Sequence, residues 1–191
     1  NYDIETFEGT LKVTAFENEV VVTIKGNKGT VTYDGNPHSV EGYEVTNISN
    51  KLYKENDIGF TGEAKAEGTK AGTYQMNLTA QQFSNISQNF TNVEFVVEDG
   101  SLTINPKSIT PDGPDTPDEK KTGITVTDPE GSKYDGEEHK NKPTVTDTKT
   151  KATLKEGTDY ELSYSKDVIN AGTVTVTVTG IGNYEGSFEV T

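Results

Sequence analysis

A short motif that occurs twice in the chain constrains its fold more than any other feature. Its two copies consist of Tyr33, Asp34, Gly35 and His38, and of Tyr134, Asp135, Gly136 and His139. The chain has 2 histidines in all, and each of them closes one copy of the motif. Two histidines are unlikely to fall at equivalent positions of two motifs by chance. We therefore interpret the chain as a tandem array of related modules.

Further landmarks follow each copy of the motif in the same order. Ala71-Gly72-Thr73 corresponds to Ala171-Gly172-Thr173, and residues that alternate between apolar and polar follow both triplets. Between the two repeats the composition changes to prolines and acidic residues with few apolar side chains. From this organisation we predict four parts: the closing strand of a preceding module (1–18), a first β-sandwich repeat (19–106), an acidic Pro-rich linker (107–122) and a second β-sandwich repeat (123–191).

Short alternating segments throughout the chain predict strands with one buried face. Residues 20–24 are rich in β-branched side chains, which favour strands, and Val93, Phe95 and Val97 follow a period of two. Residues 26–29 predict a turn, and Asp34-Gly35 predicts a tight hairpin corner. No segment has a helical period with caps at its ends. The expected fold class is all-β, with tandem Ig-like β-sandwich modules joined by a Pro/Asp-rich linker.

The net charge of -14 limits the partners that the chain can bind. Nucleic acids and anionic membranes are recognised through clusters of Lys and Arg, which a chain with 31 acidic and 17 basic residues disfavours. Mutual repulsion between copies favours a monomer. The chain has no cysteine, which excludes disulfides and thiolate metal sites. It also lacks the run of about 18 apolar residues that a membrane-spanning helix needs, so we expect no membrane insertion.

Together these landmarks resemble a known family. The Tyr-Asp-Gly-x-x-His motif, the Ala-Gly-Thr triplets and the closing strand Glu8-Gly9-Thr10-Leu11-Lys12-Val13 are similar to the repeats called MBG and YDG domains. The resemblance covers nearly all of the chain except the linker. It implies Ig-like spacer or adhesive segments of large secreted or cell-wall-anchored proteins of Gram-positive bacteria. The family supplies no catalytic residue.

The residues of the motif could mark a site or merely fix the geometry of a turn. One histidine per module is too few for a zinc site without help from carboxylates. We favour a structural role, in which His38 and His139 hydrogen-bond to the neighbouring turn. In the same way, Tyr33 and Tyr134 are expected to be core rings whose hydroxyl finds a partner. A sugar-binding platform is the alternative that stays open.

Carboxylates recur at every third residue of the linker, at Asp112, Asp115 and Asp118. Carboxylates in an extended chain could ligate Ca²⁺ and stiffen the joint between modules. However, calcium takes six or more oxygen ligands, and the spacing fits no EF-hand loop. We therefore favour a solvated, charged spacer and no cofactor, with a weak calcium site as the alternative.

A covalent cross-link is a further alternative for a surface stalk. Some sandwich modules of Gram-positive surface proteins join a Lys to an Asn or Asp side chain with the help of a nearby carboxylate. A buried lysine can become nucleophilic, because burial disfavours its charged form. Lys25 and Asn77 are candidate partners, although Asn77 follows the polar phase of its alternating segment and is expected to be exposed.

These observations favour a non-enzymatic stalk or spacer that projects a distal domain from a cell surface or cell wall. The sequence contains no nucleophile elbow and no phosphate-binding glycine loop, so we expect no catalytic activity. Its partners would be neighbouring repeats of the same chain, with host or glycan ligands as a further expectation. One alternative is an adhesive or carbohydrate-binding module that uses Tyr43, Tyr53 and Phe60 as exposed aromatic contacts. The other is an accessory region of a large extracellular enzyme.

Overall fold

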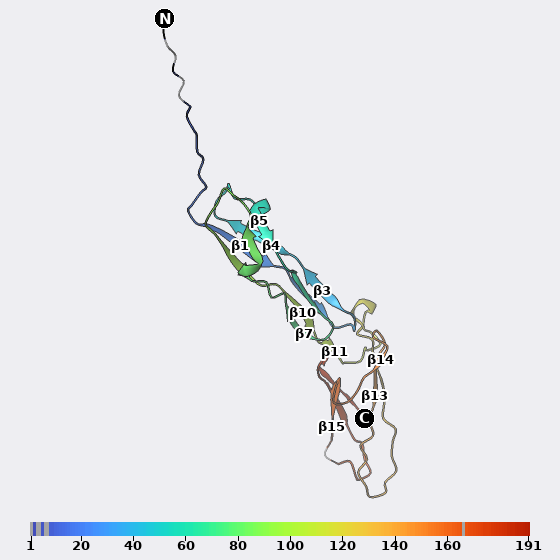
Figure 1. Ribbon diagram of the computed structural model, residues 1–191. Helices are drawn as coiled ribbons and strands as arrows, with labels where there is room; N and C mark the ends of the chain where they lie inside the picture. The colour runs from blue at the N-terminus through green and yellow to red at the C-terminus, as the bar shows by residue number, and fades with distance from the viewer. Residues whose placement is uncertain (1, 3–4, 6–7, 166) are drawn as a thin grey trace. The chain divides into compact units, whose positions relative to one another are not determined.

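The computed structural model describes every residue except 1, 3–4, 6–7 and 166, and it shows an all-β chain (Figure 1). Its described residues form strands and short 3-10 helices, with no α-helix among them. The predicted fold class is therefore confirmed at the level of all-β. The chain divides into two compact units, of which unit 1 comprises Asn1–Asn27, Glu41–Ala64 and Met76–Gly100, and unit 2 comprises Lys28–Val40, Lys65–Gln75 and Ser101–Thr191.

Unit 1 is built around the β-branched strand that the sequence predicted. This strand, β1 (Val20–Gly26), lies between β4 (Tyr43–Ile48) and β9 (Val93–Glu98) in a three-stranded sheet. Its alternate side chains Val20, Val22 and Ile24 are completely buried, as the period of two requires. The other elements of unit 1 are η1 (Glu55–Asp57), β5 (Ile58–Phe60), η2 (Ala80–Gln82) and β8 (Phe83–Asn85).

Unit 2 contains several small sheets. The first has the order β2 (Lys28–Thr32), β10 (Ser101–Asn105) and β7 (Gly72–Gln75). Two others have the orders β12 (Ile124–Thr127), β13 (Thr144–Asp147), β14 (Ala152–Thr153) and β15 (Tyr160–Tyr164), β16 (Val176–Gly180), β18 (Ser187–Val190). The two-stranded pairs are β3 (His38–Glu41) with β6 (Lys65–Gly68), and β11 (Lys107–Ser108) with β17 (Tyr184–Glu185).

The core of unit 2 collects residues from segments that are far apart in the sequence. Ile109, Val145 and Val178 are completely buried and come from the predicted linker, from β13 and from β16. Burying one such aliphatic side chain contributes about 1.5–3 kcal/mol. Residues 107–109 are therefore part of a sheet and a core, and the expectation that the linker is a solvated spacer from residue 107 onward is wrong at its start.

Neither of two predicted turns joins strands that pair with each other. Residues 26–29 were expected to turn the chain, yet β1 and β2 do not pair with each other. Each pairs parallel with its own partner, Val20 opposite Val93 in one ladder and Lys28 opposite Ser101 in the other, with the same separation along the sequence. Asp34-Gly35 does not close a hairpin either, because β2 and β3 belong to different sheets. Parallel pairing of this kind needs a long crossover, which local turn signals do not reveal.

Two predicted strands are shorter than expected or absent. The alternating segment after Gly72 is a strand only as far as Gln75, because Asn77 has a left-handed backbone with φ of 60°. In the predicted closing strand, residues 1, 3–4 and 6–7 lie outside the described residues. The described remainder of 1–18 forms no strand, and Leu11 and Val13 are 93% and 87% exposed.

Candidate functional site

A buried ion pair in unit 2 is the most unusual chemical feature of the described chain. Lys107 Nζ lies 2.6 Å from Asp147 Oδ2. Lys107 is 5% exposed and Asp147 is completely buried, and they are the two charged residues among the buried side chains of the described part. Removing two charges from water costs several kcal/mol per ion, so a pair like this must be closely matched by its surroundings.

The surroundings of Asp147 satisfy both of its carboxylate oxygens. Oδ1 accepts hydrogen bonds from the backbone N–H groups of Lys149 (3.0 Å) and Thr150 (3.3 Å). Oδ2 accepts a hydrogen bond from the hydroxyl of Tyr184 at 3.2 Å, in addition to the one from the Lys107 ammonium. Burial, together with the charge of Asp147, raises the pKa of the Tyr184 hydroxyl, so this group stays a hydrogen-bond donor.

The sheets of unit 2 place these three side chains. β11 pairs parallel with β17, and the N–H groups of Lys107 and Ile109 donate to the carbonyls of Asn183 and Glu185. Lys107 and Ile109 are two residues apart and therefore point to the same side, into the core. Asp147 ends β13 opposite Ile124, and its side chain has the same inward phase as that of Val145.

The first copy of the motif contacts the same region through its tyrosine. The rings of Tyr33 and Tyr184 meet edge to face, with centroids 5.6 Å apart. Tyr33 packs against the core of unit 2, and burial, with smaller effects from nearby aspartates, raises the pKa of its hydroxyl. Beside it, the N–H of Ala71 donates to Asn183 Oδ1 at 2.8 Å. Both landmarks of the first repeat therefore contact the residues 183–184.

The remainder of the first copy forms a closed polar turn. Asp34 Oδ1 accepts the N–H of Asn36 at 2.9 Å and lies 2.8 Å from His38 Nε2. Gly35 has a φ of 81°, a backbone conformation that favours glycine. The hydrogen bonds from Asn36 and His38 lower the pKa of Asp34 to about 2. His38 therefore contacts the turn of its own motif, and no second histidine lies in the same turn.

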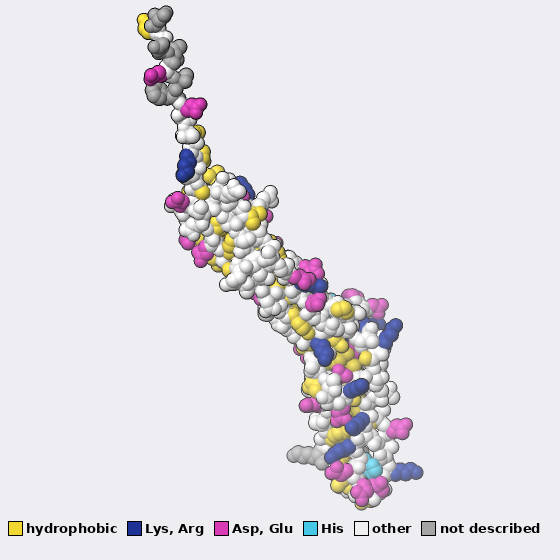
Figure 2. Space-filling view, in the orientation of Figure 1, with side chains coloured by type: hydrophobic (Ala, Val, Ile, Leu, Met, Phe, Trp, Pro, Cys, Tyr) yellow, Lys and Arg dark blue, Asp and Glu magenta, His cyan; other side chains and the backbone are white. Residues whose placement is uncertain are grey.

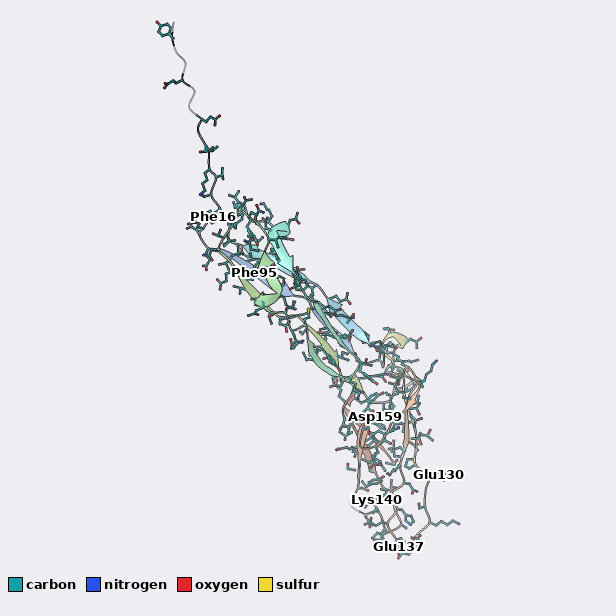
Figure 3. The ribbon with its side chains drawn as sticks, viewed as in Figure 1. Phe16, Phe95, Glu130, Glu137, Lys140 and Asp159 are labelled. Carbon is teal, nitrogen blue, oxygen red and sulfur yellow. The ribbon has the colours of Figure 1, made fainter. Side chains whose placement is uncertain are left out.

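The second copy forms the same turn in a different environment. Asp135 Oδ1 accepts the N–H of Glu137 at 2.9 Å and lies 3.0 Å from His139 Nε2, and these contacts lower the pKa of Asp135. Its tyrosine, however, is 66% exposed, so the expectation that Tyr134 is a core ring is wrong. Figure 3 shows charged side chains around this turn, including Glu130, Glu137 and Lys140.

Next to the second copy, unit 2 has an open cleft of about 580 Å³. Its lining combines aromatic, imidazole and amide side chains, among them Tyr134, His139, Asn141 and Tyr164. Ala171 and Gly172, the equivalents of Ala71 and Gly72, also line it. The cleft has the size of a small-molecule site.

The aromatic residues that were expected to bind a ligand lie in the interior of unit 1. Tyr53 is 1% exposed, so its expected exposure is wrong. Its hydroxyl donates to the carbonyl of Asp57 at 2.9 Å. Tyr43 and Phe60 are partly buried and pack against each other and against Phe83, with centroids about 5 Å apart. The aromatic side chains of unit 1 are drawn with its ribbon in Figure 3, where Phe95 is labelled.

The three linker aspartates are engaged separately. Asp112 accepts the N–H groups of Thr122 and Gly123, both at 2.7 Å, and these bonds lower its pKa although burial opposes the shift. Asp118 pairs with Lys121 at 2.6 Å, and Asp115 is exposed. Within the described ranges, no three His, Asp or Glu side chains are grouped so that they could hold a metal ion. The structure therefore does not bring together Asp112, Asp115 and Asp118.

The predicted cross-linking residues are also in unsuitable surroundings. Lys25 has a side chain that is 50% exposed and lies 3.5 Å from Glu98 Oε2. The cross-link chemistry needs a buried lysine, and the half-exposed Lys25 does not provide one. Asn77 is exposed, as expected.

Lys107, Asp147 and Tyr184 were not singled out from the sequence as site residues. One local signal existed for two of them. Asp147 occupies the apolar phase of a strand, two residues after Val145, and Lys107 precedes Ile109 in the same way. A charged residue in the inward phase of a strand needs a buried partner. Sequence alone could not say that these two residues meet, because they are far apart along the chain.

On the face shown in Figure 2, several lysines follow one another along the lower part of the view, and acidic side chains are interspersed with them. None of the helical segments in the described residues has the length and hydrophobicity to cross a membrane.

Comparison with known proteins gives one family. Residues 20–106 match the family model of the MBG domain. The match spans β1 to β10 and includes the first copy of the motif, which confirms the resemblance for this stretch. The relation of residues 123–191 to the same family stays a prediction. A search of curated proteins and a search of solved structures each gave no match. Residues 20–106 of the chain are therefore similar to the MBG domain, which is typically extracellular.

Proposed function

We propose that the chain is a structural stalk or spacer of an extracellular protein, made of an MBG domain and a second, related repeat. The observation that carries this proposal is the junction in unit 2. There, residues of the MBG segment, including Tyr33, Ala71 and Leu102, belong to the same compact unit as residues 123–191. A module that shares a unit with its successor transmits position and force, which is what a spacer does.

The junction combines three kinds of contact. It has an aromatic pair between Tyr33 and Tyr184, a hydrogen bond from Ala71 to Asn183, and the short parallel pairing of β11 with β17. Aromatic pairs add about 0.5–1.5 kcal/mol beyond their area, and a hydrogen bond adds about 1 kcal/mol. The aromatic pair and the hydrogen bond both resist a change in the orientation of residues 183–185 relative to the residues of the MBG segment that they contact.

Pulling the chain by its two ends in a force spectrometer tests this role. A spacer is expected to unfold unit 2 in one cooperative step, in which residues 28–40, 65–75 and 101–191 are released together. Separate release of residues 123–191 at low force, before the MBG segment loses any structure, would contradict the proposal, because the junction would then transmit no load.

A second candidate function rests on the cleft beside the second motif. Its exposed Tyr134 and its neighbouring imidazole and amide groups offer a stacking surface and hydrogen-bond partners for a sugar. A glycan array with the wild type and a Tyr134→Ala variant distinguishes the two functions. Saturable binding that the variant loses would support a carbohydrate-binding module, and the absence of binding favours the spacer.

A further inference from the structure

We propose that Lys107 and Asp147 are joined by an intramolecular isopeptide bond, formed when the amine and the carboxyl group condense inside folded unit 2. This inference stands on the geometry of the buried pair and does not depend on the spacer role. It moves the cross-link that the sequence suggested for Lys25 and Asn77 to two other residues.

The first argument is proximity in a dry environment. Lys107 Nζ is 2.6 Å from Oδ2, and Oδ2 is bonded to the carbon that the amine would attack. Two groups that are fixed against each other react as if at very high concentration, because the entropy of bringing them together has already been lost on folding. The side chains are 7% and 0% exposed, so little water competes for either group.

The second argument is the pair of donors on the other oxygen. Attack on the carboxyl carbon places negative charge on Oδ1. This atom already accepts the N–H groups of Lys149 and Thr150, at 3.0 and 3.3 Å. Two backbone N–H groups directed at the atom that becomes an oxyanion are the arrangement that stabilises tetrahedral intermediates in acyl transfer.

The reaction balances without any co-reactant. One proton moves from the Lys107 ammonium to Oδ2, which leaves a neutral amine and a carboxylic acid, and desolvation penalises the charged pair that they replace. The amine then attacks the carboxyl carbon, and a second proton from nitrogen accompanies Oδ2 as it leaves as water. The hydroxyl of Tyr184, 3.2 Å from Oδ2, donates a hydrogen bond to the oxygen that departs.

Burial distinguishes this pair from the other close pairs of lysine and carboxylate. Lys142 lies 2.5 Å from Glu156 and Lys121 lies 2.6 Å from Asp118, which are equally short distances. Their side chains are between 38% and 93% exposed, so water solvates both charged groups of each pair. Because the distances are similar, burial is what predicts a bond at Lys107 and none at Lys142 or Lys121.

The intact mass of the purified, denatured wild-type chain tests the inference directly. We expect a mass that is lower than the sequence mass by one water molecule. After digestion with trypsin, the peptide that contains Lys107 and the peptide that contains Asp147 should remain joined, which distinguishes the bond from dehydration within a single peptide. A mass equal to that of the sequence, with the two peptides separate, would overturn the inference without the need for any variant.

Two variants locate the bond. Lys107→Arg retains the positive charge but has no amine that condenses, and its mass should match its own sequence. Lys142→Arg makes the same change at an exposed pair of similar length and should still lack one water. A mass deficit that persists in Lys107→Arg would place the dehydration elsewhere and would also overturn the proposal.

Discussion

The two copies of the motif have the same turn but different surroundings. In both, an aspartate accepts a backbone N–H two residues later and contacts the histidine that closes the motif. Tyr33 packs on the core of unit 2, whereas Tyr134 is 66% exposed. The comparison shows that the motif fixes a local turn, and that the part of the chain that packs on it decides what its tyrosine does.

The second landmark differs in the same way. Ala71 donates its N–H to Asn183, whereas its equivalent Ala171 lines the open cleft beside Tyr134. The cleft thus lies beside Tyr134 and Ala171, whereas residues 183–184 contact Tyr33 and Ala71, the corresponding residues of the first copy. The residues at the two landmarks correspond, and they are covered in the first copy and open in the second.

The largest expected effect comes from removing the buried carboxylate that contacts Lys107 and Tyr184, the tyrosine on which the covered Tyr33 packs. Asp147→Ala leaves Lys107 buried without a partner, which should destabilise unit 2 by at least about 3–5 kcal/mol. Amide hydrogen exchange of β13 and β16 measures this loss. The control Glu156→Ala removes the acid of an exposed pair. It should change the free energy of opening that exchange reports by less than about 1 kcal/mol. Similar effects of the two substitutions would show that the buried pair contributes little.

The tyrosines test the comparison itself. Tyr33→Ala removes a ring that packs on a core and contacts Tyr184, and should cost about 2 kcal/mol in the stability of unit 2. Tyr134→Ala removes an exposed ring and should change stability by no more than about 0.5 kcal/mol. Denaturant unfolding of both variants gives the two values. Equal losses would mean that the two copies do not differ in their surroundings.

A smaller effect is expected at the hydrogen bond between the landmarks. Asn183→Ala removes the acceptor of the Ala71 N–H, which should cost about 1 kcal/mol. Hydrogen exchange of the Ala71 amide is the most direct measurement, because this N–H should become more accessible. No change in its exchange rate would contradict the contact between Ala71 and residue 183.

The smallest effect concerns the turn that the two copies share. The hydrogen bonds hold the pKa of Asp34 at about 2 against an ordinary value of 3.8, and also lower that of Asp135. Because the folded pKa is the lower one, this stabilisation is present above pH 3.8 and is lost as the pH falls toward 2. Carboxyl NMR titration should give midpoints below 3.8 for both. A midpoint at 3.8 in one copy would show that its turn is open.

The sequence predicted more of unit 1 than of unit 2. The strands at 20–24 and 93–97 were identified because β-branched residues and a period of two report a local preference and one buried face. The hairpin predicted at Asp34-Gly35 was wrong, and the turn predicted at 26–29 does not join two paired strands, because glycine-containing segments permit a change of direction but do not select the partner strand. The parallel partners of β1 and β2 come from residues 93–105, and β3 pairs with β6.

The candidate site shows a similar division. The sequence marked the motif residues, and the structure places Asp34 with His38 and Asp135 with His139. It did not mark Lys107 or Asp147, because a buried ion pair depends on contacts between segments that only folding brings together. The expectation that Tyr53 is exposed was wrong, because the sequence around an aromatic residue does not tell whether another segment covers its ring.

The sequence by itself therefore determined that the chain is all-β, that it repeats a turn closed by histidine, and that residues 20–106 resemble the MBG family. These properties follow from local patterns, since side-chain periodicity, turn chemistry and internal similarity are read over short distances. Only the tertiary structure decided that Tyr33 is covered while Tyr134 is open, and that Lys107 meets Asp147 in a dry core. The burial of a side chain is set by what packs on it, and that depends on the whole unit.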